Sequence, residues 1–404
     1  MPAVNLHELL GQPRASEFLR GVVASDRYAN AYLFHGAPGV GKGTAALAFA
    51  RAILCHSTAR AEAAAPGLFD AAPDAGLAAA GRPADDACGA CEACAKAADL
   101  QHPDLRFLFP VSGEERQLET TVAETLAAWR GNPFFTFTYE KASSIRLSLT
   151  RELLRELAYK PFEAGRRVVV VRDADRMRED QYSAMLKSIE EPGDVTVWVL
   201  TTARLGRIPA TIRSRCQGVR FSPLPEDTVI GFLEAEVGVP NREARMLAAL
   251  SAGSLARALN LRDENPVEMR NQSLAMLEPA ARGDAAALWK AATSMTRFGK
   301  AGRETLRQMV EFQQLWLRDL LRARYGAARE ELVNRDREAD IRRQAEHLSA
   351  EEIRRRLMVL EEMVRSIDGN ITPELAFFSG MSRVAGARFG ERDWPKHTTA
   401  RWAY

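Results

Sequence analysis

The segment Gly36-Ala37-Pro38-Gly39-Val40-Gly41-Lys42-Gly43-Thr44 contains the residue types that bind the phosphates of a nucleotide. Glycines let the backbone turn its N–H groups toward phosphate oxygens, and a helix that starts there adds the partial positive charge of its N-terminus. The ammonium group of a lysine reaches the outer phosphates. The segment therefore predicts an ATP- or ADP-binding loop, with its contacts at Gly36, Pro38, Gly39, Gly41, Lys42, Gly43 and Thr44.

The residue after Lys42 does not fit a magnesium-dependent phosphate loop. Such a loop continues with Ser or Thr, whose hydroxyl binds Mg²⁺. Here Gly43 takes that position, and Thr44 comes one residue later. The loop thus predicts nucleotide binding, but it argues against Mg²⁺ being held there in the usual way.

A second group of residues that could take part in catalysis follows the apolar run Val168–Val171. In phosphate-loop ATPases an acidic pair ends the neighbouring strand: an Asp supports the Mg²⁺ shell, and a Glu orients or activates the attacking water. Asp173 stands at the first position and Ala174 at the second. Because a methyl group accepts no proton, and losing a general base costs roughly 10²–10⁴ in rate, ATP hydrolysis by this chain is predicted to be weak or absent.

The cysteines predict a structural zinc site. Three of the five have the spacing CxxCxxC, which lets one loop wrap a tetrahedral ion. A structural zinc needs a fourth ligand, and a thiolate at the end of the helix after the phosphate loop is available. The predicted ligands are Cys55, Cys88, Cys91 and Cys94, with His56 and His102 as alternatives to Cys55.

Arg215 is a candidate to act outside its own chain. It lies in the segment Arg213-Ser214-Arg215-Cys216, after a strand and a short helix. An arginine at a domain edge is usually only solvated. This position, however, makes it a candidate to reach the nucleotide of a neighbouring subunit.

The hydrophobic pattern predicts an α/β domain that positions these groups. Apolar runs at 31–34, 105–109, 168–171 and 195–202 have the character of strands, and helical patterns at 45–54, 149–159 and 180–191 lie between them. This alternation predicts a parallel sheet. After residue 221 only helical patterns remain. The predicted division is a nucleotide-binding domain at 1–222 with a zinc module at 55–94 and a flexible insertion at 56–87, a helical lid at 223–262, a helical collar at 263–387 and a tail at 388–404.

Composition excludes some classes of function. A net charge of +2 gives no strong overall electrostatic attraction to nucleic acid, so any contact with DNA would have to come from a local part of the surface. The chain lacks the roughly 20 consecutive apolar residues of a membrane helix, and its N-terminus lacks the pattern of a signal peptide. Together with the metal-type cysteine spacing, this predicts a cytoplasmic protein without membrane contact.

In this order, the features resemble the bacterial DNA polymerase III clamp-loader subunits of the AAA+ ATPase class. The resemblance covers residues 5–220 strongly and 221–380 weakly. It implies an AAA+ fold, followed by a lid and a collar that assembles into a hetero-oligomeric ring. The segments that carry it, besides the phosphate loop and the cysteines, are Gly11-Gln12, Asn30–Gly36, His102-Pro103-Asp104, Ala184–Pro192, Ser214-Arg215-Cys216 and Asn370–Ala376.

Departures from the motor pattern favour the delta-prime type over the tau/gamma type. They are Ala174, Gly43, and Ala256 at the position of a motor's sensor arginine. The resemblance then implies tau/gamma and delta subunits as partners, in a ring that places a sliding clamp on primed DNA. It implies that Arg215 is an arginine finger for the ATP of an adjacent motor subunit, and that Thr201 or Thr202 stands at the sensor-1 position, of which Thr202 is the predicted site residue.

Two alternative functions remain compatible with the sequence. One is an active ATPase of the tau/gamma type. The other is a small-molecule kinase, because the phosphate loop also resembles that of adenylate kinases. A kinase would have no reason for the four cysteines, the Ser-Arg-Cys element or a collar of this length.

Overall fold

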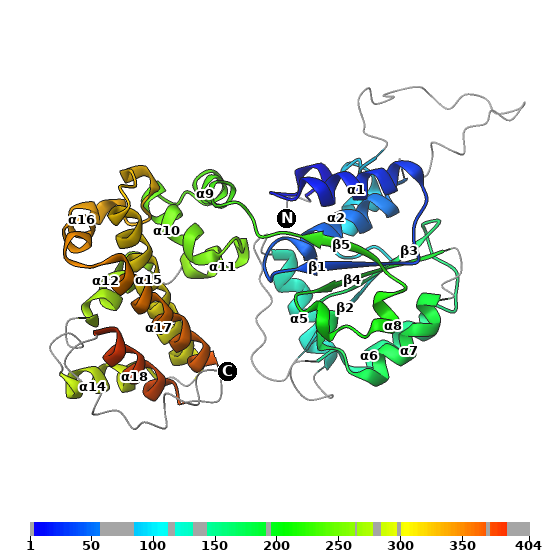
Figure 1. Ribbon diagram of the computed structural model, residues 1–404. Coiled ribbons are helices and arrows are strands. Elements are labelled where there is room, and N and C mark those ends of the chain that lie inside the picture. Colours follow the sequence, from blue (N-terminus) through cyan, green and yellow to red (C-terminus); the bar gives the residue numbers. More distant parts are fainter. Residues whose placement is uncertain are drawn as a thin grey trace, which may run out of the picture. The chain divides into compact units, whose positions relative to one another are not determined.

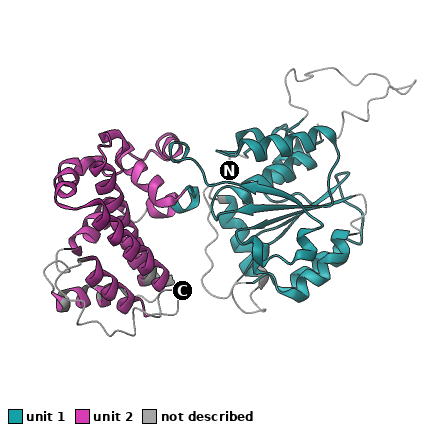
Figure 2. Cartoon of the chain, in the orientation of Figure 1, with its two compact units in different colours: residues 1–228, 253–257 teal, residues 229–252, 258–404 magenta. Residues whose placement is uncertain are grey.

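The computed structural model describes the chain as two compact units (Figures 1 and 2). Unit 1 comprises residues 1–228 and 253–257, and unit 2 comprises residues 229–252 and 258–404. The predicted insertion, apart from residues 56 and 85–87, and the predicted tail lie outside the described residues. Those described are 4–56, 85–111, 118–131, 144–190, 195–262, 265–277, 284–296, 300–368 and 372–385.

Unit 1 is built on a five-stranded sheet in the order β2-β3-β4-β1-β5. Every pairing in it is parallel, so the predicted α/β fold class with a phosphate loop after the first strand is confirmed. β1 lies between β4 and β5, so the loop that follows it is one strand in from the edge of the sheet. The strands are β1 (Ala31–Gly36), β2 (Leu105–Leu108), β3 (Arg167–Val171), β4 (Thr196–Thr202) and β5 (Gln217–Phe221).

Helices cover both faces of the sheet (Figure 1). Successive strand residues point to opposite faces, so Tyr32 and Phe34 join one core while Ala31 and Leu33 join the other. Because helices cover both faces, the inner strands are buried on both sides, and this explains why their sequences are unbroken apolar runs. The first core includes α1 (Pro13–Ser25), α2 (Lys42–Leu54) and α4 (Glu92–Ala98), and the second includes α6 (Leu147–Glu156), α7 (Glu179–Glu190) and α8 (Ala210–Arg213).

The edge strand β5 is not predicted from the sequence. Only Val219 and Phe221 among its residues are buried, and Gln217, Gly218 and Arg220 are exposed. An edge strand has one neighbour and needs no long apolar run, so its local pattern is weak. Pairing with β1 decides its structure.

The described residues of unit 2 form helices joined by turns and loops, without strands. α15 (Lys300–Arg324) is its long central helix, and its buried residues share one core with those of the helices around it. The division of this half of the chain into a lid and a collar remains a prediction. The remaining helices are α9 (Glu226–Ala235), α10 (Asn241–Ser251), α11 (Leu255–Arg262), α12 (Pro266–Ala275), α14 (Ala285–Thr296), α16 (Glu338–His347), α17 (Ala350–Asp368) and α18 (Pro373–Ala385), with α9 and α11 beginning in unit 1.

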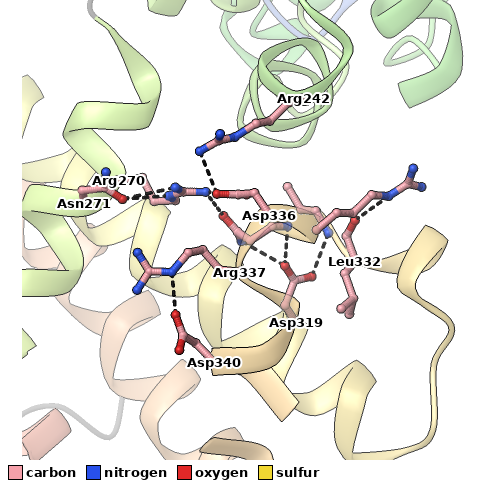
Figure 3. Close-up of polar contacts among 11 residues, drawn as sticks. Arg242, Arg270, Asn271, Asp319, Leu332, Asp336, Arg337 and Asp340 are labelled. Atoms are coloured by element: carbon pink, nitrogen blue, oxygen red, sulfur yellow. Dashed lines mark hydrogen bonds and ion pairs between the residues drawn. The ribbon is translucent and has the colours of Figure 1, made fainter. Parts of the chain in front are cut away.

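A buried polar network organises the connection between α15 and α16 (Figure 3). The fully buried carboxylate of Asp319 accepts hydrogen bonds from the backbone N–H groups of Val333 at 3.1 Å and Asn334 at 2.8 Å. Arg270 of α12 and Arg242 of α10 donate to the two carboxylate oxygens of Asp336, at 2.8 and 2.7 Å. The network therefore ties three helices to one loop.

The charge pairs in this network make it sensitive to acid. Burial alone would raise the pKa of Asp336, but the hydrogen bond and charge of Arg270, with the charge of Arg242, hold it below its usual value. In the unfolded chain the pKa of this carboxyl is about 3.9. Because its pKa is lower in the folded protein, the ionised carboxylate stabilises the fold at any pH above about 3.9. This stabilisation is lost as the pH falls from there through the pKa of the folded protein.

Replacing Asp319 with Ala should destabilise the chain by about 3 kcal/mol. The substitution leaves buried N–H donors without an acceptor, and each unsatisfied donor costs roughly 1–3 kcal/mol. Denaturant unfolding of the full chain, followed by circular dichroism, measures this. Asp340→Ala is the matched control, because Asp340 pairs with Arg337 at the surface and such pairs contribute under about 1 kcal/mol. Equal effects of the two substitutions would contradict the structural role given to Asp319.

Candidate functional site

The predicted phosphate loop joins the end of β1 to the start of α2. Gly39 and Gly41 have φ values of +73° and +95°, in the left-handed region that favours glycine. A Cβ atom on Gly39 would lie 2.1 Å from the Ser254 Oγ, because the segment 253–257 of unit 1 packs against the loop. The backbone N–H of Ala256 also donates to the Gly39 carbonyl at 3.4 Å. The strand-loop-helix context required of a phosphate loop is therefore present.

Lys42 lies folded over this loop and is only 6 % exposed. Its Nζ donates to the carbonyl oxygens of Gly36 at 2.9 Å and Ala37 at 2.5 Å. Burial lowers the pKa of Lys42 to about 8, although the carboxylate of Asp173 acts in the opposite direction. An anion at the loop would favour the charged amine.

The carboxyl end of β3 lies beside the loop. Asp173 has a left-handed backbone with φ of +49°, and its N–H donates to the Thr201 hydroxyl at 3.0 Å. Its carboxylate is near enough to Lys42 to influence the pKa of that amine. Ala174 is fully buried. This strand end therefore brings the carboxylate of Asp173 near the loop, and the next residue, Ala174, has none.

Thr202 faces a different carboxylate. Its buried hydroxyl donates to Asp175 Oδ1 at 2.8 Å, and Arg204 Nε donates to Asp175 Oδ2 at 2.7 Å. Asp175 is absent from the predicted site. The sequence Asp173-Ala174-Asp175, with a second carboxylate two residues after the first, could have indicated it. The structure thus couples Thr201 to Asp173 and Thr202 to Asp175.

Thr44 is turned toward another face of α2. Successive helix residues differ by about 100° in direction, so a one-residue displacement changes the surroundings of the side chain. Thr44 lines a small cavity with Leu47 and Arg51 of α2 and Ala97 of α4. Thr44, which comes one residue late in the sequence, therefore lies on the side of α2 toward α4.

The four predicted metal ligands come together. Their sulfur atoms all lie within 4.8 Å of one another. The Sγ atoms of Cys55 and Cys91 are 3.9 Å apart, as are those of Cys88 and Cys94. A tetrahedral ion with metal–sulfur bonds of about 2.3 Å requires sulfur–sulfur distances of about 3.8 Å. Among the described residues, these four cysteines form a group that could hold a metal ion.

Backbone geometry and electrostatics of the cysteine group fit a cation. The N–H groups of Cys88, Cys91 and Cys94 each point at the preceding sulfur, at 3.4, 3.3 and 3.4 Å. Contact with the Cys55 thiol, together with burial, raises the pKa of Cys94. Packing the thiolates together therefore favours a positive ion between them. His102 has another role, since its Nδ1 accepts the N–H of Asp104 at 3.1 Å.

Arg215 lies at the surface between α8 and β5, with 40 % of its side chain exposed. Its Nε is 2.5 Å from Glu190 Oε1 at the end of α7, and its Nη1 donates to the Thr211 carbonyl at 3.0 Å. Sequence patterns did not indicate the contact with Glu190. The structure keeps this guanidinium apart from the cysteine group and displays it to solvent.

Comparison with known proteins gives a consistent set of relatives. The model of the family described as "DNA polymerase III, delta subunit" matches residues 11–66 and 75–225. The DNA polymerase III subunit delta' of Bacillus subtilis is 25 % identical over 268 residues, which cover 66 % of this chain and 64 % of that protein. The delta' subunit of Pseudomonas aeruginosa is 28 % identical over 248 residues, or 61 % of this chain and 60 % of that protein.

Two further similar proteins have lower sequence identity. The DNA polymerase III subunit tau of Bacillus subtilis is 21 % identical over 64 % of this chain and 37 % of its own length. A solved Thermotoga maritima protein related to the gamma subunit is 20 % identical over 72 % of this chain and 98 % of that one, with a TM-score of 0.33. The chain thus spans less than two thirds of the length of these delta' and tau relatives. In the part of the chain that the structure describes, no helix is both long and apolar enough to cross a membrane.

Proposed function

The chain belongs to the family described as "DNA polymerase III, delta subunit", and from this premise we propose that it acts as a clamp-loader subunit of the delta' type. Its partners would be tau/gamma and delta subunits, and the assembled ring would place a sliding clamp on primed DNA in the cytoplasm. The names of its delta' and tau relatives support this choice of partners.

The observation that carries the non-hydrolytic role is the carboxyl end of β3. Asp173 is near enough to Lys42 to influence the pKa of that amine, yet the next residue is the fully buried Ala174. No side chain at that position can activate water. The chain would therefore keep a pocket for ATP or ADP, contacted by the glycines of the loop, Lys42 and Asp173, and leave hydrolysis to the motor subunits. The exposed Arg215 would serve as the arginine finger for a neighbour.

Zinc is the proposed occupant of the cysteine group. Four thiolates in tetrahedral spacing are typical of structural zinc and leave no coordination position open for a substrate. The ion would connect Cys55 at the end of α2 to the residues that precede and begin α4. Its role would be to hold this module on the sheet.

A motor of the tau/gamma type is the competing function. The similarity to the tau subunit and the intact lysine of the loop favour it. Steady-state ATP turnover by the purified chain distinguishes the two.

Purified alone, the chain should turn over ATP at least about 10²-fold more slowly than a tau/gamma subunit from the same organism, because it lacks the general base. Mixed with the tau/gamma and delta subunits, it should elute with them as one complex whose turnover is stimulated by primed DNA. Phosphate release and gel filtration measure these results. Turnover by the isolated chain at the motor's rate would favour the motor function, and failure to co-elute would refute the clamp-loader proposal.

A further inference from the structure

We infer that Arg172 takes the place of Mg²⁺ in this nucleotide pocket, so that the chain binds the phosphates of ATP or ADP without a metal ion. The inference rests on the proposed nucleotide pocket and concerns the residue that neutralises its phosphates. It comes from four contacts of Arg172, the first of them at the first turn of α2.

The first contact is at Gly43, the position where a phosphate loop normally has its metal-binding hydroxyl. A Cβ atom on Gly43 would lie 2.7 Å from Arg172 Nη1, 3.3 Å from Cζ and 3.7 Å from Nη2. The guanidinium thus lies directly against the glycine. A Ser or Thr at residue 43 would require this guanidinium to move, so the absence of the hydroxyl and the present position of the arginine are linked.

Three further contacts hold the arginine. The Arg172 backbone N–H donates to the Leu108 carbonyl at 2.7 Å, which places the residue at the end of β3 beside β2. Its Cζ is 5.6 Å from the centre of the Trp129 ring, within the range of a cation–π interaction. Its Nε is 3.6 Å from Asp173 Oδ2. The guanidinium therefore lies between an aromatic ring, a carboxylate and the start of α2.

The contact with Asp173 also affects magnesium. In a metal-dependent loop, the strand-end Asp supports the shell of the ion. Here this carboxylate has a fixed cation beside it, and its partner hydroxyl at residue 43 is absent. The residues present thus do not fit a magnesium ion, whereas Arg172 and Lys42 together supply two positive charges. A guanidinium, moreover, presents a planar set of donors suited to phosphate oxygens.

Binding of ADP and ATP to the full chain, measured by calorimetry in excess magnesium and in excess EDTA, tests the inference. The wild-type dissociation constant in EDTA should rise by less than about tenfold over its value in magnesium. Arg172→Ala should weaken binding in EDTA by about 10- to 100-fold, because it removes a charge-assisted contact. Arg172→Lys should be intermediate, since it keeps the charge without the planar donors.

Arg178→Ala is the matched control. Arg178 lies near the same strand end, but its side chain is 73 % exposed and pairs with Asp180, so its loss should leave binding unchanged. Circular dichroism checks that each variant is folded. If Arg172→Ala does not fold, the EDTA series on the wild type and Arg172→Lys still decides the question.

Three results would overturn the inference: strong loss of wild-type binding in EDTA, wild-type affinity in folded Arg172→Ala, or no nucleotide binding in either buffer. None of these results tests whether the chain assembles with the other subunits. A chain that co-elutes with tau/gamma and delta subunits but needs magnesium for nucleotide would refute the role of Arg172 and leave the clamp-loader proposal standing.

Discussion

Arg215→Ala should lower the DNA-stimulated ATP turnover of the assembled loader by about 10³-fold at the site that receives this residue, the lower end of the range for arginine fingers. A guanidinium that reaches the transferring phosphoryl group stabilises charge that develops in the transition state. Arg215 is suited to this because its side chain is partly exposed and is oriented by Glu190 and the Thr211 carbonyl. Reconstituted complexes with wild-type motor subunits, assayed for phosphate release, measure the effect.

The control for this experiment is Arg213→Ala, an exposed arginine two residues earlier at the end of α8. It removes the same charge from the same surface. Both variants should co-elute with the other subunits, because neither side chain is part of a core. Unchanged turnover with Arg215→Ala, or an equal loss with Arg213→Ala, would refute the specific role of Arg215.

Cys94→Ser should abolish zinc binding and release the module that contains α4. Structural zinc contributes about 10–16 kcal/mol of apparent binding free energy in small zinc modules. Here the ion would join α2, which is part of the sheet core, to residues 88–94. Elemental analysis of the purified chain and limited proteolysis around α4 measure the two effects, and prolonged chelation of the wild type should reproduce them.

The matched control is Cys216→Ser. Cys216 packs against the other core of unit 1 and is not part of the four-sulfur group. Its substitution should leave the zinc content at the wild-type level. If Cys94→Ser keeps its zinc, or if the wild type contains none, the metal assignment is wrong.

The sequence alone predicted the parallel sheet and the phosphate loop because both depend on strong local patterns. Val168–Val171 is apolar on both faces, and the glycines of the loop stand at fixed offsets from Lys42. The cysteine group was predictable for the same reason, since three of its four thiols lie within seven consecutive residues, 88–94. The edge strand β5 escaped prediction because its exposed residues show no such run.

The tertiary structure decided how these pieces meet. No local pattern shows that Arg172 lies against Gly43, that Glu190 orients Arg215, or that Thr202 turns to Asp175, because each contact joins elements far apart in the chain. Residue types and spacing determined which chemistry was available: phosphate binding, a thiolate site and a missing general base. Packing of β3 beside α2 determined which cation lies against the loop, since only the folded sheet brings Arg172, at the end of β3, against the first turn of α2.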